Sequence, residues 1–171
     1  MSNTIAEQIS QYNLYNANDK LVGITEVTLP SFEAMTNTVS GAGILGEYET
    51  TSPGQFSSSE IEIPFRVIDK TAAELLKTKG HLLFLRAAVQ VKDQSTHQLL
   101  TKQLKVTIGG TPKGVTIGTG ATAKAMDSSI KMEITYYKHV YDGSTLFELD
   151  KLNNVHVVND EDQLADIKAI I

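Results

Sequence analysis

The sequence contains no cysteine and no tryptophan, and aromatic side chains make up only 6% of its 171 residues. Without cysteine the chain has no disulfide, no thiolate metal ligand and no cysteine nucleophile, so packing and assembly must stabilise it. It also lacks the apolar run of about 20 residues that a membrane span requires. Residues 1–15 contain no basic stretch followed by an apolar one. We therefore expect no membrane anchor, no secretory signal, and synthesis in the cytoplasm.

Positive charge is also in short supply, because 15 lysines and arginines stand against 20 acidic residues, for a net charge of -5. Proteins that bind duplex DNA regardless of sequence neutralise phosphates with clustered basic residues, and this balance argues against that class. The length and the 41% hydrophobic content are typical of one compact domain, so residues 1–171 are predicted to form a single unit.

Alternation of apolar and polar residues is the dominant pattern and predicts a mainly β protein of about eight strands. The longest alternating run puts Ile130, Met132, Ile134 and Tyr136 on a buried face and Tyr137 on the outer face. This run ends at Asp142-Gly143, a pair typical of a two-residue hairpin turn, and the chain returns through residues 145–149. Further strands are predicted at 12–15, 21–29, 31–39 and 82–91.

Two short helices accompany the strands. Thr71 with Glu74 three residues later resembles a capping box, and Gly80 is a stop signal. A second helix is predicted after Asp160, with Leu164, Ile167 and Ile171 along one side. Residues 40–59 and 109–125 are rich in Gly, Ser, Thr and Ala and are predicted to be long loops, which in a compact domain suggests a function for each.

A search for catalytic or cofactor chemistry yields weak signals. Gly118 and Gly120 superficially fit a dinucleotide fingerprint, but that motif needs a helix at the glycines, and a strand follows instead. The order of Lys113-Gly114 is the reverse of a phosphate loop. The four histidines are scattered and form no metal or triad pattern. The sequence therefore predicts no enzyme activity, no metal and no cofactor.

One pair of glutamates and one tyrosine on predicted strands allow both a structural and a functional interpretation. Glu60 and Glu62 lie on one strand face, which is more often a solvated surface than a pair of catalytic carboxylates. Tyr137, predicted to be exposed, is either an ordinary surface residue or a contact between subunits, because tyrosine is enriched at interfaces.

Several features together resemble one family. They are Val27-Thr28-Leu29-Pro30, Gly41-Ala42-Gly43, Tyr136-Tyr137 running into Asp142-Gly143 with Glu148 and Asp150, and the closing Asp162-Gln163-Leu164-Ala165. In this order they resemble the major tail tube proteins of contractile phages and of R-type bacteriocins, over about residues 12–171. The 109–125 segment departs from the family by being longer and richer in glycine.

The resemblance implies an antiparallel β-sandwich or half-barrel with a flanking helix, and six copies in a ring. Rings would stack helically into a hollow tube in a virion tail or bacteriocin particle, surrounded by sheath protein and joined to tape measure and baseplate proteins. The lumen would carry DNA without binding it specifically, or open a conduit through the target envelope. The predicted antiparallel strands agree with this arrangement, because closure of the sheet across subunits would pair the exposed strand edges.

Within this arrangement, polar strand faces are predicted to line the lumen, with the strands chosen from the family and the residues from alternation: Thr36, Thr38, Ser58, Glu60 and Glu62. Residues 40–59 are predicted to be a segment that is mobile in the free protomer and orders between rings. Its contact residues would be Gly41, Gly43, Ile44, Leu45, Tyr48 and Phe56. The main alternative is a monomeric β-sandwich module that binds carbohydrate or peptide. Secretion tubes and non-contractile tail tubes share the architecture, so the fold alone does not name the particle.

Overall fold

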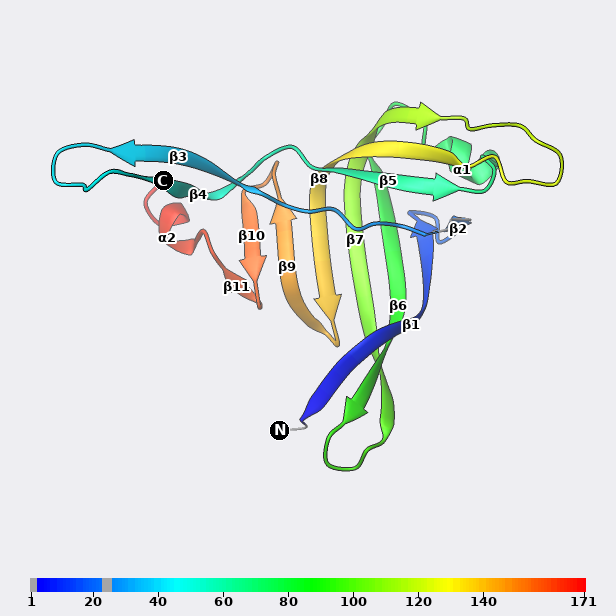
Figure 1. Cartoon of the computed structure of the whole chain (residues 1–171), viewed down its shortest axis with the longest axis horizontal. Helices are drawn as coiled ribbons and strands as arrows, with labels where there is room; N and C mark the ends of the chain where they lie inside the picture. Colours follow the sequence, from blue (N-terminus) through cyan, green and yellow to red (C-terminus); the bar gives the residue numbers. More distant parts are fainter. Residues whose placement is uncertain (1–2, 23–25) are drawn as a thin grey trace.

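The computed structural model describes residues 3–22 and 26–171 and consists mainly of antiparallel strands (Figure 1). In chain order the elements are β1 (Thr4–Asn16), β2 (Leu21–Val22), β3 (Ala34–Ser40), β4 (Glu47–Phe56), β5 (Glu60–Phe65), α1 (Lys70–Glu74), β6 (His81–Asp93), β7 (Leu99–Thr116), β8 (Ser128–Tyr141), β9 (Ser144–Asp150), β10 (Val155–Val158), β11 (Glu161–Asp162) and α2 (Ala165–Lys168). The predicted fold class, mainly β with antiparallel sheets and two short helices, is confirmed.

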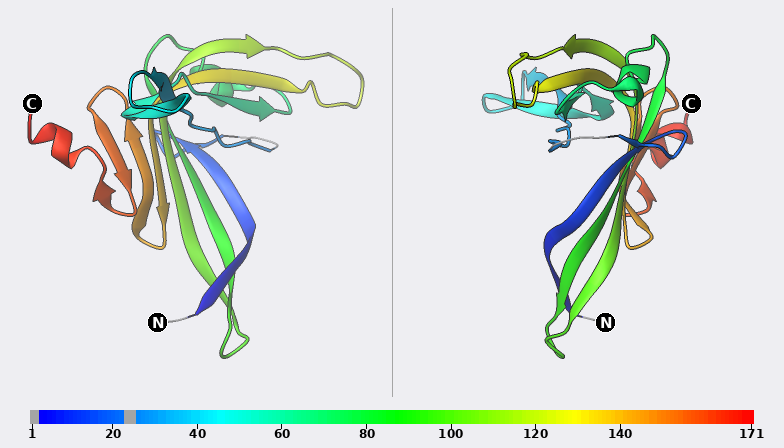
Figure 2. Two further views of the ribbon diagram at one scale, coloured as in Figure 1. Left: turned by 60° about the vertical axis from the view of Figure 1, so that its left-hand side comes forward. Right: turned by 90° about the vertical axis from the view of Figure 1, so that its right-hand side faces the viewer.

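One large sheet holds most of the strands in the order β11-β10-β9-β8-β7-β6-β1-β2. β8 is long enough to pair with two strands on the same side. Its first part pairs with β5, where Ile63 lies opposite Ile130, and its second part pairs with β9. The β3–β4 hairpin is a separate two-stranded sheet. In the described part of the chain the large sheet is strongly curved and does not close on itself, which gives it the shape of a half-barrel (Figure 2).

The core lies on one face of this curved sheet. Alternate residues of β6 and β7 point into it, including Leu83, Leu85, Val106 and Ile108, all buried. Residues 26–33 cross the sheet between β2 and β3 and pack Val27, Leu29 and Phe32 against the core (Figure 1). The buried side chains of β5 and α1 complete it. This burial of apolar surface is the main force that holds the strands together.

The predicted hairpin at Asp142-Gly143 is confirmed. β8 and β9 pair up to Tyr141 opposite Ser144, so the two residues between them form the whole turn. Asp142 has a φ of 49° and Gly143 a φ of 88°, the positive values that this kind of turn requires.

Both segments predicted to be long loops are largely strand, and these two predictions are wrong. In the first, Ser40 ends β3, residues 47–56 form β4, and only residues 41–46 and 57–59 are irregular. In the second, β7 continues to Thr116 and the loop covers only 117–127. The glycines of β7 mark register shifts, one between Gly109 and Gly110 and one between Pro112 and Gly114, where one strand bulges against β8.

The remaining predicted elements are found with different boundaries. α1 is capped by Asp69, whose Oδ1 accepts a hydrogen bond from the Ala72 N–H at 2.7 Å, and not by Thr71. The C-terminal helix is found as α2. β1 extends the strand predicted at 12–15 to both sides. The strand predicted at 21–29 is limited to β2; residues 23–25 lie outside the described residues.

Candidate functional site

Three segments extend beyond the packed core: the β3–β4 hairpin, the β6–β7 hairpin and the loop 117–127 (Figures 1 and 2). The β3–β4 hairpin carries most of the residues predicted to contact a neighbouring subunit. It points away from the body at one end of the longest axis of the molecule, while the loop 117–127 lies at the other end (Figure 1).

The β3–β4 hairpin exposes both of its faces. Paired residues share a face, so Thr36 with Thr51 and Thr38 with Glu49 form one side, and Val39 with Tyr48 forms the other. An isolated two-stranded ribbon is at best marginally stable in water. A hairpin of this length with no third strand is therefore a surface that a partner would stabilise.

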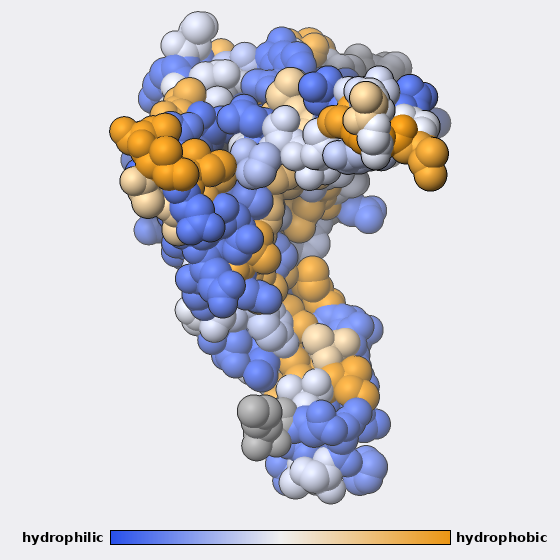
Figure 3. Space-filling view, turned by 90° about the vertical axis from the view of Figure 1, so that its left-hand side faces the viewer, coloured by the Kyte–Doolittle hydropathy of each residue, from blue (hydrophilic) through white to orange (hydrophobic). Residues whose placement is uncertain are grey.

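The tip of the hairpin is apolar. Of the predicted contact residues, Gly41, Gly43, Ile44 and Leu45 lie in its turn and Tyr48 lies near the start of β4; all are exposed, and Leu45 completely so. In the view onto this end of the molecule, apolar side chains gather at two separate corners, one on the hairpin and one at the C-terminal helix (Figure 3). Such exposed apolar groups mark interaction sites when they gather in this way.

Phe56 belongs to the core side of the hairpin, which corrects the prediction that it packs on a neighbour. Its ring lies 5.1 Å from the ring of His156 and 6.3 Å from that of Phe147, both within the same chain. Next to it Gly54 has a φ of 70°, and a Cβ there would lie 2.7 Å from a methyl group of Leu164. The base of the hairpin is thus held between β9, β10 and the C-terminal segment.

Tyr137 is buried, with 5% of its surface exposed, so the prediction of an outward ring available for a subunit contact is wrong. The reason is a bulge in β8: Tyr136 lies opposite Gly109 and Ile134 opposite Gly110, which leaves Thr135 as an extra residue. The extra residue reverses the alternation, so Tyr137 points inward.

The two tyrosines of this pair have exchanged their predicted places. The Tyr137 ring lies 4.9 Å from the ring of Phe32, and burial raises the pKa of Tyr137 to about 12. Tyr136 lies on the other face and its hydroxyl donates a hydrogen bond to Glu148 at 2.9 Å. Burial, followed by this carboxylate, raises the pKa of Tyr136 to about 12 as well.

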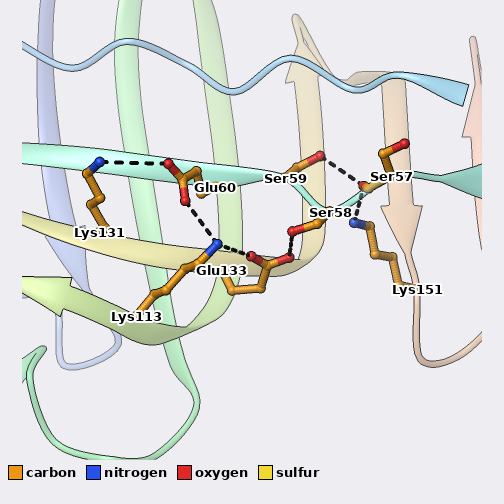
Figure 4. Close-up of polar contacts among 8 residues, drawn as sticks. All are labelled: Ser57, Ser58, Ser59, Glu60, Lys113, Lys131, Glu133 and Lys151. Atoms are coloured by element: carbon orange, nitrogen blue, oxygen red, sulfur yellow. Dashed lines mark hydrogen bonds and ion pairs between the residues drawn. The ribbon is translucent and has the colours of Figure 1, made fainter.

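A polar cluster covers the outer face where β5, β7 and β8 run together (Figure 4). The Lys113 ammonium lies 3.1 Å from Glu60 and 3.4 Å from Glu133, and Lys131 lies 3.9 Å from Glu60. The Ser58 hydroxyl donates to Glu133 at 2.6 Å. That hydrogen bond, followed by Lys113, lowers the pKa of Glu133, and the two carboxylates raise the pKa of Lys113. The arrangement is a surface network of ion pairs and hydrogen bonds.

The residues predicted to line a lumen fall into two groups. Ser58 and Glu60 belong to the polar cluster, and the neighbouring Glu62 accepts a hydrogen bond from the Ser129 hydroxyl at 2.6 Å. Thr36 and Thr38 lie apart, in the two-stranded sheet of the projecting hairpin. All five are exposed. Alternation correctly predicts that Glu60 and Glu62 point away from the core, since Ile61 and Ile63 are buried.

Sequence reasoning missed the lysine partners of these carboxylates. Glu133 and Lys131 belong to the predicted outer face of β8, but Lys113 lies in a segment predicted to be a loop. Only the pairing of β7 with β8 brings Lys113 across to Glu133, and strand pairing is not visible in a single sequence. Among the described residues there is no group of three His, Asp or Glu side chains that could hold a metal ion. No described helix is long and apolar enough to cross a membrane.

His156 is the one buried polar group in the described residues that lacks a hydrogen-bond partner, at its Nδ1 atom. Its ring stands edge-on to Phe56 and Phe147 at the base of the hairpin. Burial lowers the pKa of His156, and the nearby Asp162 carboxylate opposes that effect in part. The charged imidazole is therefore less favourable at this position than in water.

We expect His156→Phe to reduce the loss of folding stability as the pH falls from 7.5 to 5.5. Because the folded-state pKa of His156 lies below its usual 6.5, the unfolded chain binds the proton more readily, and stability is lost as the pH falls through about 6.5. Thermal melting at pH 7.5 and pH 5.5 should show a smaller drop in Tm for the variant than for the wild type. Burial also lowers the pKa of His139, which leaves a residual slope. An unchanged drop in Tm would contradict the prediction.

Comparisons with known proteins identify the family of the chain and one structure of similar fold. The model of the family described as phage tail tube protein FII matches residues 6–171. A chain in the cryo-EM structure of the anti-feeding prophage (AFP) baseplate, 6-fold symmetrised, has a similar fold, with a TM-score of 0.50 at 6% identity, covering 75% of this chain and 90% of that one. At this identity the likeness shows the fold alone. A search of curated proteins found no match.

Proposed function

Because the chain belongs to the phage tail tube protein FII family, whose members are structural proteins and not enzymes, we propose that six copies form a ring and that rings stack into a hollow tube. The tube would be the inner conduit of a contractile tail, enclosed by sheath protein and joined to tape measure and baseplate proteins. It would carry DNA from a virion, or open the target envelope if the particle is a bacteriocin.

The observation that carries the proposal is the outer part of the β3–β4 hairpin, residues 35–51, which is exposed throughout apart from the half-buried Val39. In a monomeric ligand-binding module the apolar tip of this hairpin would stay exposed to water. In a stacked assembly each repeat would cover the tip of its neighbour. The chain of similar fold comes from a baseplate that was symmetrised sixfold, which supports the proposal of six copies in each ring.

The edges of the large sheet support lateral assembly. β1 pairs with β6 on one side, and among the residues that the structure describes its other side pairs with β2 at Leu14 and Tyr15, near its end. The opposite edge ends at the short strands β10 and β11. Unpaired strand edges attract further strands, and a ring in which one protomer's β1 edge lies beside the next protomer would cover them. Such contacts between unlike surfaces close into rings or continue as helices.

Native mass measurement over a range of concentrations tests this proposal. We expect hexamers and multiples of hexamers, in equilibrium with the protomer and favoured by high concentration. A protein that stays monomeric at the highest accessible concentration would contradict the tube and favour the alternative of a monomeric binding module.

The proposed lumen face consists of Glu60 and Glu62 of β5 and of Ser58 just before that strand. Thr36 and Thr38 share a face of the hairpin with Glu49, so we place them at the contact between rings instead. Lys113 and Lys131 partly neutralise Glu60, while Glu62 has a hydrogen bond and no ion pair among the described residues. The net charge of -5 adds to this balance. A neutral to negative wall lets DNA slide, because it offers no sites for counterion release.

We expect Glu62→Lys to make assembled tubes retain duplex DNA. The substitution places a ring of six added cations on the wall, and binding through phosphate neutralisation falls steeply with salt. Tubes of the variant should bring down labelled DNA in sedimentation at about 50 mM salt and release it at several hundred millimolar, while wild-type tubes retain none. Asp166→Lys on α2 has the same change of charge at a different place and serves as the control. Equal retention by both variants would remove Glu62 from the lumen.

A further inference from the structure

A pocket of about 500 Å³ lies between α1, the turn after β1 and the start of β6, on the side of the molecule away from the β3–β4 hairpin (Figure 1). Its wall includes Leu75, which is buried, and Leu82, which is 44% exposed. The volume is large enough for the apolar side chains of a short turn. Lys20, Lys70 and Lys79 stand around these apolar groups.

The pocket is electrically positive. Glu74 is the only acidic residue among those that line it, and its carboxylate already forms an ion pair with Lys77 at 2.5 Å. In the part of the chain that the structure describes, the ammonium groups of Lys20, Lys70 and Lys79 form no ion pair, and all three lysines are exposed. The site therefore offers unpaired cations beside the partly exposed Leu82, in a lining that is otherwise mostly polar.

The hairpin carries the opposite charge. Between Ala34 and Phe56 the sequence has Glu47 and Glu49 and no lysine or arginine. The two glutamates are alternate residues of β4 and share one face, directly after the apolar tip formed by Ile44 and Leu45. Both are exposed, and neither has an ion pair among the residues placed in the structure. An apolar tip followed by two carboxylates complements a pocket that offers the exposed part of Leu82 and three unpaired ammonium groups.

We propose that this pocket is the receptor for the β3–β4 hairpin tip of a second copy of the chain in the adjacent ring. Leu45 of the hairpin enters the pocket against the exposed part of Leu82, and Glu47 and Glu49 pair with the lysines of the lining. Because the hairpin and the pocket lie on different sides of the protomer, each copy both donates a tip and receives one. The contact repeats without end, as a stacked tube requires. This inference rests on the proposed function.

Charge reversal tests the pairing. We expect Glu47→Lys with Glu49→Lys, and separately Lys70→Glu with Lys79→Glu, each to reduce the mass of sedimentable tubes at least about tenfold, because like charges meet in the contact. A chain that carries all four substitutions restores the complementarity and should recover tube formation. It contains every change of the two defective variants and is therefore their matched control. Circular dichroism checks that each protomer is folded.

An engineered cross-link gives an independent measurement. The chain has no cysteine, so a mixture of the Leu45→Cys and Leu82→Cys variants has only these two thiols. Under mild oxidation of co-assembled tubes we expect a disulfide-linked dimer that carries one of each variant. Leu152→Cys, which is also largely exposed but does not belong to the hairpin tip, should give no such product with Leu82→Cys.

The outcomes separate the two levels of the proposal. Wild-type protein that forms no rings or tubes contradicts the proposed function. If the wild type and both charge-reversal variants form tubes equally well, the receptor pocket is contradicted and the proposed tube is not. The same conclusion follows if tubes form but the Leu45→Cys and Leu82→Cys variants do not cross-link. The exposed C-terminal Ile171 is the competing occupant, and a cross-link from Ile171→Cys to Leu82→Cys in place of Leu45→Cys would overturn the proposal in its favour.

Discussion

Replacing residues 37–50 by Asn-Gly is expected to abolish tube formation while the protomer stays folded. Thr36 and Thr51 lie opposite each other in the hairpin, so a two-residue turn can join them without changing the register. The deletion removes the apolar tip, both glutamates and Tyr48. The packing at the base, where Phe56 meets Phe147 and His156, remains.

The measurement is the yield of sedimentable tubes, with thermal melting of the free protomer as the control. We expect no tubes from the shortened chain and a Tm within a few degrees of the wild type, because the deleted residues bury little apolar surface in the protomer. Hydrogen exchange adds a second readout: residues 41–49 should exchange rapidly in the free wild-type protein and slowly in tubes. Tubes of normal length from the shortened chain would show that the hairpin takes no part in stacking.

Gly110→Ala is expected to destabilise the protomer by about 3 kcal/mol, a large effect for the addition of one methyl group. A Cβ at this position would lie 2.1 Å from the carbonyl oxygen of Glu133, a distance that no real structure tolerates. The register shift between Gly109 and Gly110 brings the two backbones this close, so β7 and β8 must separate to admit the methyl group. The polar cluster around Glu133 would be displaced at the same time.

Urea unfolding of the monomeric protein measures this effect, and Gly114→Ala is the matched control. Gly114 also lies at a register shift of β7, but a Cβ there meets no atom within 4 Å and its φ is not positive. The control should therefore change the free energy of unfolding by less than about 0.5 kcal/mol. Equal midpoints for the two variants would mean that the close approach of Gly110 to Glu133 does not exist in solution.

Sequence reasoning predicted the parts of the fold in which local pattern and burial agree. Ile130, Met132 and Ile134 alternate with polar residues and are buried, and Asp142-Gly143 closes a turn that only residues tolerant of positive φ can form. The pattern failed at Thr135. A single inserted residue exchanges the two faces from that point on, and because both Tyr136 and Tyr137 suit either face, the sequence contains no sign of the exchange.

The second strand of the hairpin, β4, was mistaken for a loop for a related reason, whereas β3 agrees with the strand predicted at 31–39. Alternation arises only when one face of a strand is buried, and residues 47–51 of β4 are exposed on both faces. The Ser, Thr and Gly content of this segment therefore resembles that of a loop. The hairpin could still be recognised as a contact region, because Ile44, Leu45 and Tyr48 are too apolar for a simple linker. The partners of Glu60 and the basic pocket near α1 could not be predicted, since both depend on strand pairing and on chain segments far apart in the sequence.

Electron microscopy of purified protein, followed by a three-dimensional map of any tube, tests the central claim most directly. The account predicts hollow tubes of stacked sixfold rings in which the β3–β4 hairpin lies between rings and no continuous belt of lysine and arginine occupies the narrowest radius. Protein that shows neither rings nor tubes at high concentration, or a tube in which the hairpin points freely into solvent, would contradict it.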